Sequence, residues 1–316
     1  MSDILTVTMN PAVDVATSTA YVMPTHKLRC ATVQRHPGGG GVNVARVLHR
    51  LGGEVVALYP AGGASGKRLR QLLDDEGVAS CCIAITGETR ESFSVKDEGG
   101  GQEYRFVLPG PTLLAREWQA CLDQVEALAQ SARYLVVSGS LPPGVPADFY
   151  AQLIRRVKPL GVQVVLDTSG PALAAALAAG VYLVKPSLRE LRDFSGLALE
   201  TSTQWLGAAE QLIAQGRAQA VVLTLGEAGA WLITAQEVCF APGLPVKVVS
   251  AIGAGDSLVG AMVWALAQRL TLKEAFRYGV AAGSAALQSE GTGLCHPAEI
   301  ARLHDDVQLR CEVKPS

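Results

Sequence analysis

The chain has 316 residues, 49% of them hydrophobic, and is therefore long enough to bury one large core. Its formal net charge of −2 is close to neutral, which excludes a broad basic face for nucleic acid. Any anionic ligand must instead be bound by a few local cations.

Short apolar runs bounded by glycine, proline, aspartate or serine alternate with longer amphipathic stretches along the chain. Strands without polar alternation, separated by helices, predict an α/β domain with a mostly parallel central sheet covered by helices on both faces. We expect one such domain over residues 1–316, ending in a helix with a polar end within 296–316. The expected strands are 4–7, 55–59, 135–137, 162–166, 182–184 and 220–225, and the clearest helices are 116–130, 147–157 and 203–215.

Four consecutive glycines, Gly38 to Gly41, lead into a helical pattern that begins near Val44. A loop without side chains lets a ligand approach the main chain closely, and Asn43 offers both a donor and an acceptor to hydroxyl groups. A flexible linker is the alternative, but a linker is not normally followed at once by an amphipathic helix. The segment therefore predicts a ligand-binding loop.

Residues 91–96 and 102–107 alternate apolar with polar side chains and flank a Gly-Gly-Gly turn, which is typical of a β-hairpin. Residues 17–36 are expected to add strands to the same small sheet. We predict a β-lid formed by about 15–36 and 88–108 and inserted into the α/β domain. Because a small sheet cannot cover its apolar face and edges alone, the lid predicts a homodimer.

Several polar residues follow the predicted strands, where parallel sheets collect their ligands. These residues are Ser138 to Ser140, Asp167, Lys185, Ser187 and Thr224 to Gly226.

Residues 250–257 place Asp256 directly after a Gly253-Ala254-Gly255 turn and before the apolar helical run 258–266. Backbone N–H groups at such a helix N-terminus converge on an anion, and the helix dipole adds positive potential there. An aspartate in the same turn can take a proton from an attacking hydroxyl. A helix N-cap is the alternative interpretation of Asp256. The second glycine cluster at 38–41 favours phosphoryl transfer.

The cysteines and the N-terminus predict a soluble cytoplasmic protein without a membrane partner. Seven cysteines are an odd number, none has the paired spacing of a metal site, and adjacent Cys81 and Cys82 make a poor disulfide, so we expect reduced thiols. The first residues lack the basic and apolar regions of a signal peptide, and no uncharged stretch has the periodicity and length of a membrane-spanning helix.

Together, the Gly-Gly loop leading to Asn43 and the Gly-Ala-Gly-Asp turn resemble the signatures of the ribokinase-like family of carbohydrate kinases. The likeness extends over nearly the whole chain. The segments 27–30, 60–63 and 138–144 are most similar to the ATP-dependent 6-phosphofructokinase branch of that family. The resemblance implies a ribokinase-like fold with ATP and Mg²⁺ as cofactors, and it leaves open a monovalent cation such as K⁺.

The resemblance also implies roles for residues at the reacting centre and the sugar. Asp256 would be the catalytic base, with Gly253, Ala254 and Gly255 forming the anion hole for the transferring phosphoryl group. The implied substrate-binding residues are Asp14, Lys27, Gly39, Gly40, Gly41, Asn43, Arg90, Arg105 and Ser140.

Three kinds of substrate contact are distinguished within this set. Asp14 would accept bonds from sugar hydroxyls, with an Asx-turn as the alternative. Arg90 and Arg105, at opposite ends of the hairpin, would suit a phosphate ester, with solvated surface positions as the alternative. Lys27 is expected to reach the site of the partner protomer.

For the nucleotide, the resemblance implies that Glu190 influences the magnesium and phosphate arrangement. Two departures from the family pattern concern this side of the site: Ser187 replaces an asparagine, and Ala251 replaces a threonine or another small polar residue. For the segment 224–230 a plain β-turn is the alternative. The implied nucleotide-binding residues are Lys185, Ser187, Thr224, Gly226, Gly229, Ser250 and Ser284.

The predicted activity is transfer of the ATP γ-phosphoryl group to the C1 hydroxyl of fructose 6-phosphate. Within the same class, 1-phosphofructokinase or tagatose-6-phosphate kinase is the alternative, because a hydroxyl epimer or a relocated phosphate changes few contacts. A catalytically silent regulator that binds nucleotide or sugar phosphate is the alternative from another class. A nucleoside kinase of the same superfamily would have no need of Arg90 and Arg105.

Overall fold

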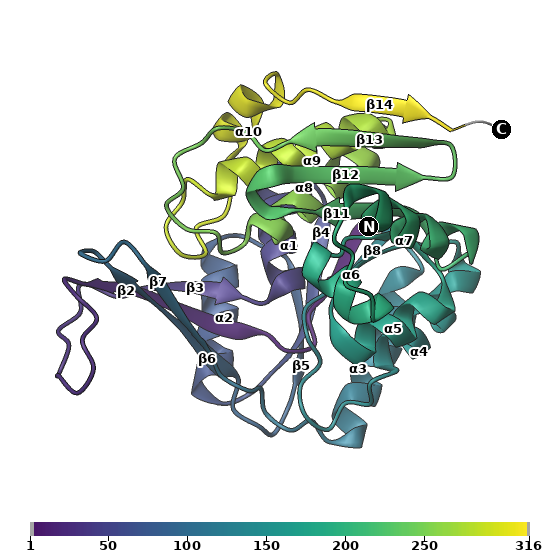
Figure 1. The fold of residues 1–316 in the computed structure, drawn as a ribbon. Helices are drawn as coiled ribbons and strands as arrows, with labels where there is room; N and C mark the ends of the chain where they lie inside the picture. The colour runs from purple at the N-terminus through teal and green to yellow at the C-terminus, as the bar shows by residue number, and fades with distance from the viewer. Residues whose placement is uncertain (1–2, 315–316) are drawn as a thin grey trace.

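The computed structural model describes residues 3–314, and its main body is a ten-stranded sheet between two layers of helices (Figure 1). The strands of this sheet are β1 (Ile4–Val7), β4 (Val55–Ala61), β5 (Ser80–Ala84), β8 (Tyr134–Ser138), β9 (Gln163–Asp167), β10 (Val181–Val184), β11 (Ala218–Thr224), β12 (Gly229–Thr234), β13 (Glu237–Pro242) and β14 (Arg310–Val313). They lie in the order β14-β13-β12-β11-β10-β9-β8-β1-β4-β5. From β11 to β5 all neighbours are parallel, whereas β12, β13 and β14 add an antiparallel edge.

Helices cover both faces of the sheet and enclose two large hydrophobic cores. The helices of the first core are α1 (Gly40–Arg50), α2 (Gly63–Asp75), α8 (Ala254–Ala267), α9 (Leu272–Ala286) and α10 (Pro297–His304). Those of the second are α3 (Ala115–Ala129), α4 (Phe149–Val157), α5 (Gly170–Ala179), α6 (Leu188–Ser195) and α7 (Ser202–Ala214). Within residues 3–314, no helix combines the length and the apolar character needed to cross a membrane.

The continuous apolar runs of the central strands follow from burial on both faces. Val136 of β8 packs in the first core and its neighbour Val137 in the second. Because side chains alternate between the faces of a strand, both must be apolar, and each fully buried side chain contributes about 1.5–3 kcal/mol. The predicted parallel sheet and its six strands are confirmed, with β1 at the predicted bounds.

A second, smaller sheet stands to one side of the main body (Figure 1). Its strands, in the order β3-β2-β6-β7, are β2 (Ala12–Thr19), β3 (Gln34–Gly38), β6 (Arg90–Asp97) and β7 (Glu103–Val107). The predicted hairpin is β6–β7, which pairs antiparallel, whereas β2 and β6 pair parallel. Of residues 17–36, which were expected to add strands, only 17–19 and 34–36 lie in β2 and β3, because pairing between these strands begins at Gln34 and residues 20–33 form no strand.

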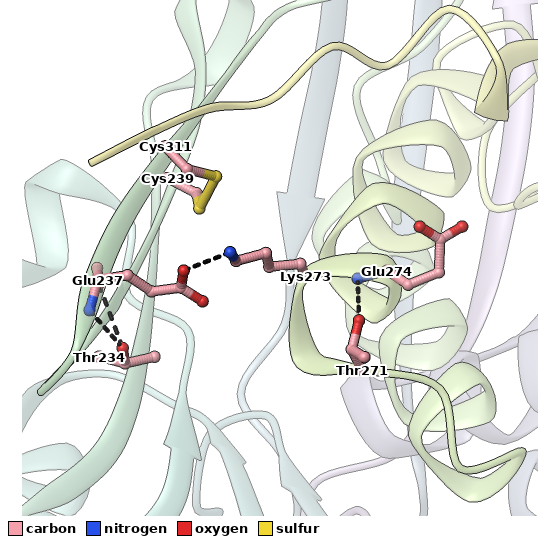
Figure 2. Close-up of a disulfide and its surroundings, with 7 residues drawn as sticks. All are labelled: Thr234, Glu237, Cys239, Thr271, Lys273, Glu274 and Cys311. Atoms are coloured by element: carbon pink, nitrogen blue, oxygen red, sulfur yellow. Dashed lines mark hydrogen bonds and ion pairs between the residues drawn. A yellow bond between two sulfur atoms is a disulfide. The ribbon is translucent and has the colours of Figure 1, made fainter. Parts of the chain in front are cut away.

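The C-terminal part contains the expected helix, α10, followed by a strand that the sequence did not reveal. Figure 2 shows a disulfide between Cys239 of β13 and Cys311 of β14, which are direct partners in the strand register. The expectation of reduced thiols is therefore wrong for this pair. Its two cysteines are 72 residues apart, so only the strand register brings them together.

The remaining short helical segments are the 3-10 turns η1 (Lys158–Leu160) and η2 (Gly226–Ala228). The second of these joins β11 to β12 at the point where the sheet changes from parallel to antiparallel pairing. The free cysteines among the described residues are Cys30, Cys81, Cys82, Cys121 and Cys295.

Candidate active site

A cavity of about 240 Å³ lies where the carboxyl ends of β8 and β9 meet the small sheet and the N-terminus of α8. This is the edge at which parallel α/β sheets bind ligands. Its lining is polar and includes carboxylates, guanidinium groups, hydroxyls and bare backbone. The lining residues are Asp14, Gly39, Gly40, Asn43, Arg90, Ser92, Arg105, Ser138, Gly139, Ser140, Asp167, Thr168, Ser169, Glu190 and Asp256.

Helix α8 begins at a glycine that no other residue could replace without strain. Gly253 is the N-cap with φ +78°, and a Cβ there would lie 2.5 Å from Leu294 Cδ2. Asp256 lies in the first helical turn, three residues after the cap. The N-cap interpretation of Asp256 is therefore wrong, and its carboxylate is free to face the cavity beside the positive end of the helix dipole.

Opposing influences act on the Asp256 carboxylate. Burial raises its pKa, whereas a hydrogen bond from Asn43 and the charges of Lys185 and Arg105 oppose that rise. Asn43 Nδ2 donates to Asp256 Oδ2 at 2.9 Å. The bond joins the two glycine segments, because Asn43 belongs to α1 and Asp256 to α8.

Lys185 lies beneath the Gly-Ala-Gly turn in a buried ion pair with Asp167, the last residue of β9. Its Nζ is 3.1 Å from Asp167 Oδ1, and a Cβ on Gly255 would lie 3.4 Å from the same Nζ. Burial raises the pKa of Asp167 to about 6 despite the attraction of Lys185. The pair therefore places a cation beside the turn predicted to bind the transferring phosphoryl group.

At the small-sheet side, Asp14 of β2 faces two arginines from the hairpin. Burial raises the pKa of Asp14, and the guanidinium groups of Arg105 and Arg90 lower it. Arg90 is held in place because it donates to the carbonyl oxygens of Asn10 at 2.9 Å and Leu108 at 3.1 Å. Asp14 lies inside a strand paired on both sides, so the Asx-turn alternative is wrong.

The glycine loop is bare because other groups occupy the space of its side chains. A Cβ on Gly40 would overlap Ser138 Oγ, and one on Gly41 would lie 2.6 Å from the Val7 carbonyl oxygen. Gly39 and Gly40 line the cavity, whereas Gly41 packs against β1. Ser140 also lines the cavity and accepts a bond from Asn10 Nδ2 at 3.3 Å.

The residues predicted for the nucleotide lie outside the lining of this cavity, except for Glu190. Ser187 is the N-cap of α6, and both its backbone N–H and its hydroxyl donate to Glu190 Oε2. Gly229 has φ +111°, and a Cβ there would overlap the Ala241 carbonyl oxygen, so the turn between β11 and β12 alone requires this glycine. The β-turn alternative thus accounts for Gly229 without a ligand.

Ser250 belongs to a neighbouring cavity of about 260 Å³ between the small sheet and residues 249–250 and 290–291. Its hydroxyl donates to Glu103 Oε2 at 2.9 Å, which links the main body to β7. Ser284 is buried in α9, and Thr224 donates its backbone N–H to the Pro186 carbonyl oxygen at 3.0 Å. Lys27 is exposed in the segment between β2 and β3 and does not line the first cavity.

The oxygen donors of the cavity fit a magnesium ion whose remaining ligands come from substrate phosphates and water. Mg²⁺ prefers oxygen ligands and is usually held by one or two carboxylates, several waters and substrate phosphates. Glu190 supplies such a carboxylate, because the hydrogen bonds that it accepts from Ser187 go to Oε2. Across residues 3–314 there is no cluster of three or more His, Cys, Asp or Glu side chains that could hold a metal by themselves.

Three kinds of site residue were not among the predicted ones. The sequence places Asp167 at a strand end, where ligands of a parallel sheet collect, but no motif assigns it a role. Ser92 and Thr168 line the cavity without any motif that could have revealed them. Arg46, which donates to Asn43 Oδ1 from behind the cavity, is not distinguished by any sequence motif.

The pfkB family carbohydrate kinase model matches residues 7–299. This chain belongs to that family. It is 44% identical over 302 residues to the ATP-dependent 6-phosphofructokinase isozyme 2 of Mycobacterium tuberculosis, a match that covers 96% of this chain and 89% of the relative. The resemblance found in the two glycine segments is thereby confirmed.

Two solved structures of pfkB family members agree with the fold described above. Phosphofructokinase-2 from Escherichia coli in complex with fructose-6-phosphate superposes with a TM-score of 0.91 at 40% identity, covering 97% of this chain and 99% of that chain. The same enzyme in complex with potassium gives a TM-score of 0.92 at 41% identity, with the same coverage. The fold is also shared with ribokinase from Arabidopsis thaliana, which superposes with a TM-score of 0.76 at 21% identity, covering 96% of this chain and 99% of that chain. The ribokinase-like fold expected from the sequence is therefore confirmed.

Proposed function

We propose that this pfkB family kinase transfers the γ-phosphoryl group of ATP to the C1 hydroxyl of fructose 6-phosphate, giving fructose 1,6-bisphosphate and ADP. One observation carries the proposal: a base-like aspartate and a pair of arginines line the same cavity. Asp256 suits the reacting hydroxyl, and Arg90 with Arg105 suits a phosphate ester at the other end of the sugar. The M. tuberculosis and E. coli relatives support the same assignment by their names.

Asp256 acts as the general base in the proposed reaction. The C1 oxygen forms a bond to the γ-phosphorus while the bond from that phosphorus to the ADP oxygen breaks, and the hydroxyl proton passes to Asp256. Asn43 holds Oδ2 by its hydrogen bond and thereby leaves Oδ1 for the substrate. Gly253, Ala254 and Gly255 supply backbone N–H groups to the transferring phosphoryl oxygens, and Lys185 adds positive charge.

The sugar is bound between the main body and the small sheet. Asp14, Asn43, Ser140 and the bare backbone of Gly39 and Gly40 offer acceptors and donors to its hydroxyl groups. Gly41 contributes by close packing on β1, which keeps the loop in place. The exposed Lys27 reaches the site of the partner protomer in the proposed dimer.

The nucleotide lies over β10, β11 and the first turn of α8, beside the residues assigned to it by family resemblance. Glu190 is the residue proposed to hold Mg²⁺, which would neutralise negative charge on the ATP phosphates. Lys185, Ser187, Thr224, Gly226, Gly229, Ser250 and Ser284 are the proposed nucleotide residues. A monovalent cation such as K⁺ is also proposed, because the similar E. coli phosphofructokinase-2 has been solved in complex with potassium.

The small sheet is proposed to act as a lid and as a dimer contact, which makes residues 15–36 and 88–108 one functional unit of a single-domain kinase. Its outer strand, β7, exposes the apolar side chains of Phe106 and Val107, which are 55% and 56% exposed. A small sheet with such a face needs a partner surface. We also propose a cytoplasmic location, where ATP and sugar phosphates are available.

The proposal is tested by measuring ADP release with Mg²⁺ and ATP across fructose 6-phosphate, fructose 1-phosphate, tagatose 6-phosphate, fructose and a nucleoside. Fructose 6-phosphate should give the highest kcat/KM. Preference for one of the other two ketose phosphates would replace it with the alternative of the same class. No ADP release with any acceptor would instead support a silent regulator, and preference for the nucleoside would remove the phosphate-binding role of the arginines.

A further inference from the structure

Arg46 of α1 carries a guanidinium group that is fully buried behind the active-site cavity. Burial of such a cation is costly unless its N–H donors are paired. Nε and Nη2 donate to the Glu76 carboxylate at 2.7–3.0 Å. Nη1 donates to the carbonyl oxygens of Pro37 at 3.1 Å and Thr292 at 3.0 Å, and to Asn43 Oδ1 at 3.4 Å.

These contacts determine which way the Asn43 amide faces. A guanidinium group has only donors, so it attracts the amide oxygen of Asn43. The amide nitrogen must then point in the opposite sense, and Nδ2 indeed donates to Asp256 Oδ2 at 2.9 Å. With the amide reversed, its N–H groups would face the guanidinium group and its oxygen would face the carboxylate. Both contacts would then be repulsive.

The same guanidinium group also braces the two glycine segments. Pro37 opens the glycine loop, and Thr292 belongs to the segment that leads to Leu294. Leu294 in turn packs against Gly253 at the start of α8. Arg46 therefore supports the loop that binds the sugar and the turn that carries Asp256.

We propose that Arg46 is a positioning residue for catalysis, which orients the Asn43 amide so that Asn43 holds Asp256 with one carboxylate oxygen free for the acceptor hydroxyl. The inference rests on the proposed function in that it takes Asp256 as the base. It adds a role for a residue that does not line the cavity, since the effect of Arg46 on Asp256 passes through the Asn43 amide.

Arg50 offers a matched control one helical turn later. It also pairs with Glu76, at 3.4 Å, and donates to the carbonyl oxygens of Gly293 at 2.6 Å and Cys295 at 3.3 Å. It therefore shares the helix, the carboxylate partner and the neighbouring segment with Arg46. No hydrogen bond joins it to Asn43 among those recorded for residues 3–314.

The kinetic test compares Arg46→Lys and Arg50→Lys with wild type, each also in an Asn43→Ala background. Lysine keeps the charge but lacks the fork that reaches all four partners. Arg46→Lys should lower kcat about 10- to 100-fold, as for a displaced catalytic group, with KM for ATP little changed. In the Asn43→Ala background the same change should cost less than about 3-fold, because the amide through which it acts is absent. Arg50→Lys should stay within about 3-fold of wild type.

The decrease of kcat at acidic pH provides a second test of the role of Arg46. Loss of the Asn43 bond raises the pKa of Asp256, so a base that must be ionised loses activity at a higher pH. Arg46→Lys should shift the acid limb upward by about one pH unit, and Arg50→Lys should not shift it. The other charged groups that act on Asp256 are unchanged in both variants: Lys185, Arg105, Asp14 and Asp167.

Three results would overturn the inference: an unchanged kcat in Arg46→Lys, an equal loss with and without Asn43, or an equal loss in Arg50→Lys. If Arg46→Lys does not fold, Glu76→Gln replaces it, because this change loosens the guanidinium group from the side away from the cavity. Its smaller kcat loss, about 2- to 5-fold, should again vanish without Asn43. Persistence of that loss in the Asn43→Ala background would reject the proposal.

Failure of the proposed function can be recognised separately. If wild type does not use fructose 6-phosphate, the same comparison is made with whichever acceptor it phosphorylates. Without any acceptor, the side-chain ¹⁵N–H₂ signals of Asn43 are followed by NMR. They should move strongly in Arg46→Lys and little in Arg50→Lys, and equal movement in both would overturn the inference.

Discussion

Asp256 is held between groups that act in opposite directions on the pKa of its carboxyl. Burial disfavours the ionised form, while the Asn43 amide, Lys185 and Arg105 favour it. As the proposed general base, Asp256 must be ionised before it can accept the proton of the acceptor hydroxyl. In the proposed reaction the position of this carboxylate at the first turn of α8 is equally important, because phosphoryl transfer depends mainly on placement and charge stabilisation.

Replacement of Asp256 by asparagine should therefore lower kcat on the order of 100-fold or more. ATP binding should survive, since the backbone donors of the turn remain. The measurement is steady-state ADP release together with ATP binding by calorimetry. Asp193→Asn is the matched control, because this α6 side chain is 67% exposed and lies outside the cavity lining. Near-normal turnover in a folded Asp256→Asn protein would remove the assignment of the base.

The arginines of the hairpin should discriminate between phosphorylated and free sugar. Arg90→Ala or Arg105→Ala should weaken kcat/KM for fructose 6-phosphate by about 1.5–3 kcal/mol, the scale for hydrogen bonds to charged groups. The value for unphosphorylated fructose and the affinity for ATP should hardly change. Arg189→Ala, whose side chain is 90% exposed, is the control and should stay within about 0.5 kcal/mol.

Equal losses for fructose 6-phosphate and fructose would mean that the arginines do not recognise the phosphate. Absence of any loss would place them on a solvated surface, as the nucleoside-kinase alternative expects. Either result would withdraw the choice of a phosphorylated substrate.

The sequence was most informative for residues whose role depends on local backbone shape. Gly253 and the glycines of the 38–41 loop are needed where a side chain would collide or where φ is positive, and such positions stand out in a sequence. Asp167 and Arg46 act through partners distant in the chain, Lys185 and Glu76. Pairings of this kind are set by the packing of elements and leave no local pattern.

The same distinction holds for whole elements. Strand β1 was predicted at its bounds because a strand buried on both faces is largely apolar: Ile4, Leu5 and Val7 are buried, and only Thr6 is polar. Strand β14 was missed because all its residues are exposed and its formation depends on pairing with β13. Strand β2 begins at Ala12, earlier than expected, since its first residues pair with β3 and β6.

The disulfide should stabilise the antiparallel edge without affecting catalysis. It closes 72 residues of chain, and such cross-links typically contribute about 2–4 kcal/mol. A reductant should therefore lower the Tm of wild type by a few degrees. Cys311→Ser should show the lowered Tm with or without reductant, while the exposed Cys30→Ser serves as the control.

The kcat should be the same in all these states, because β13 and β14 are separated from β8 and β9 by three intervening strands, β10, β11 and β12. Calorimetry and ADP release measure the two quantities. If reductant leaves the Tm of wild type unchanged, the cross-link does not stabilise the fold.

At the scale of the whole molecule, the small sheet should pair with a second copy. Light scattering should give twice the chain mass of 33.1 kDa. Phe106→Glu places a charge on the exposed face of β7 and should produce monomers with low activity. Leu160→Glu, at an exposed apolar site on η1, should remain dimeric. A strictly monomeric and fully active wild-type enzyme would contradict this prediction.

The most direct measurement is identification of the product by ³¹P NMR after incubation of wild type with fructose 6-phosphate, ATP and Mg²⁺. Placement of Asp256 beside the reacting hydroxyl and of Arg90 and Arg105 on the phosphate ester predicts a new phosphate ester at C1, giving fructose 1,6-bisphosphate with one ADP per molecule formed. Release of ADP and inorganic phosphate without a new ester, or an unchanged spectrum, would contradict the proposed reaction.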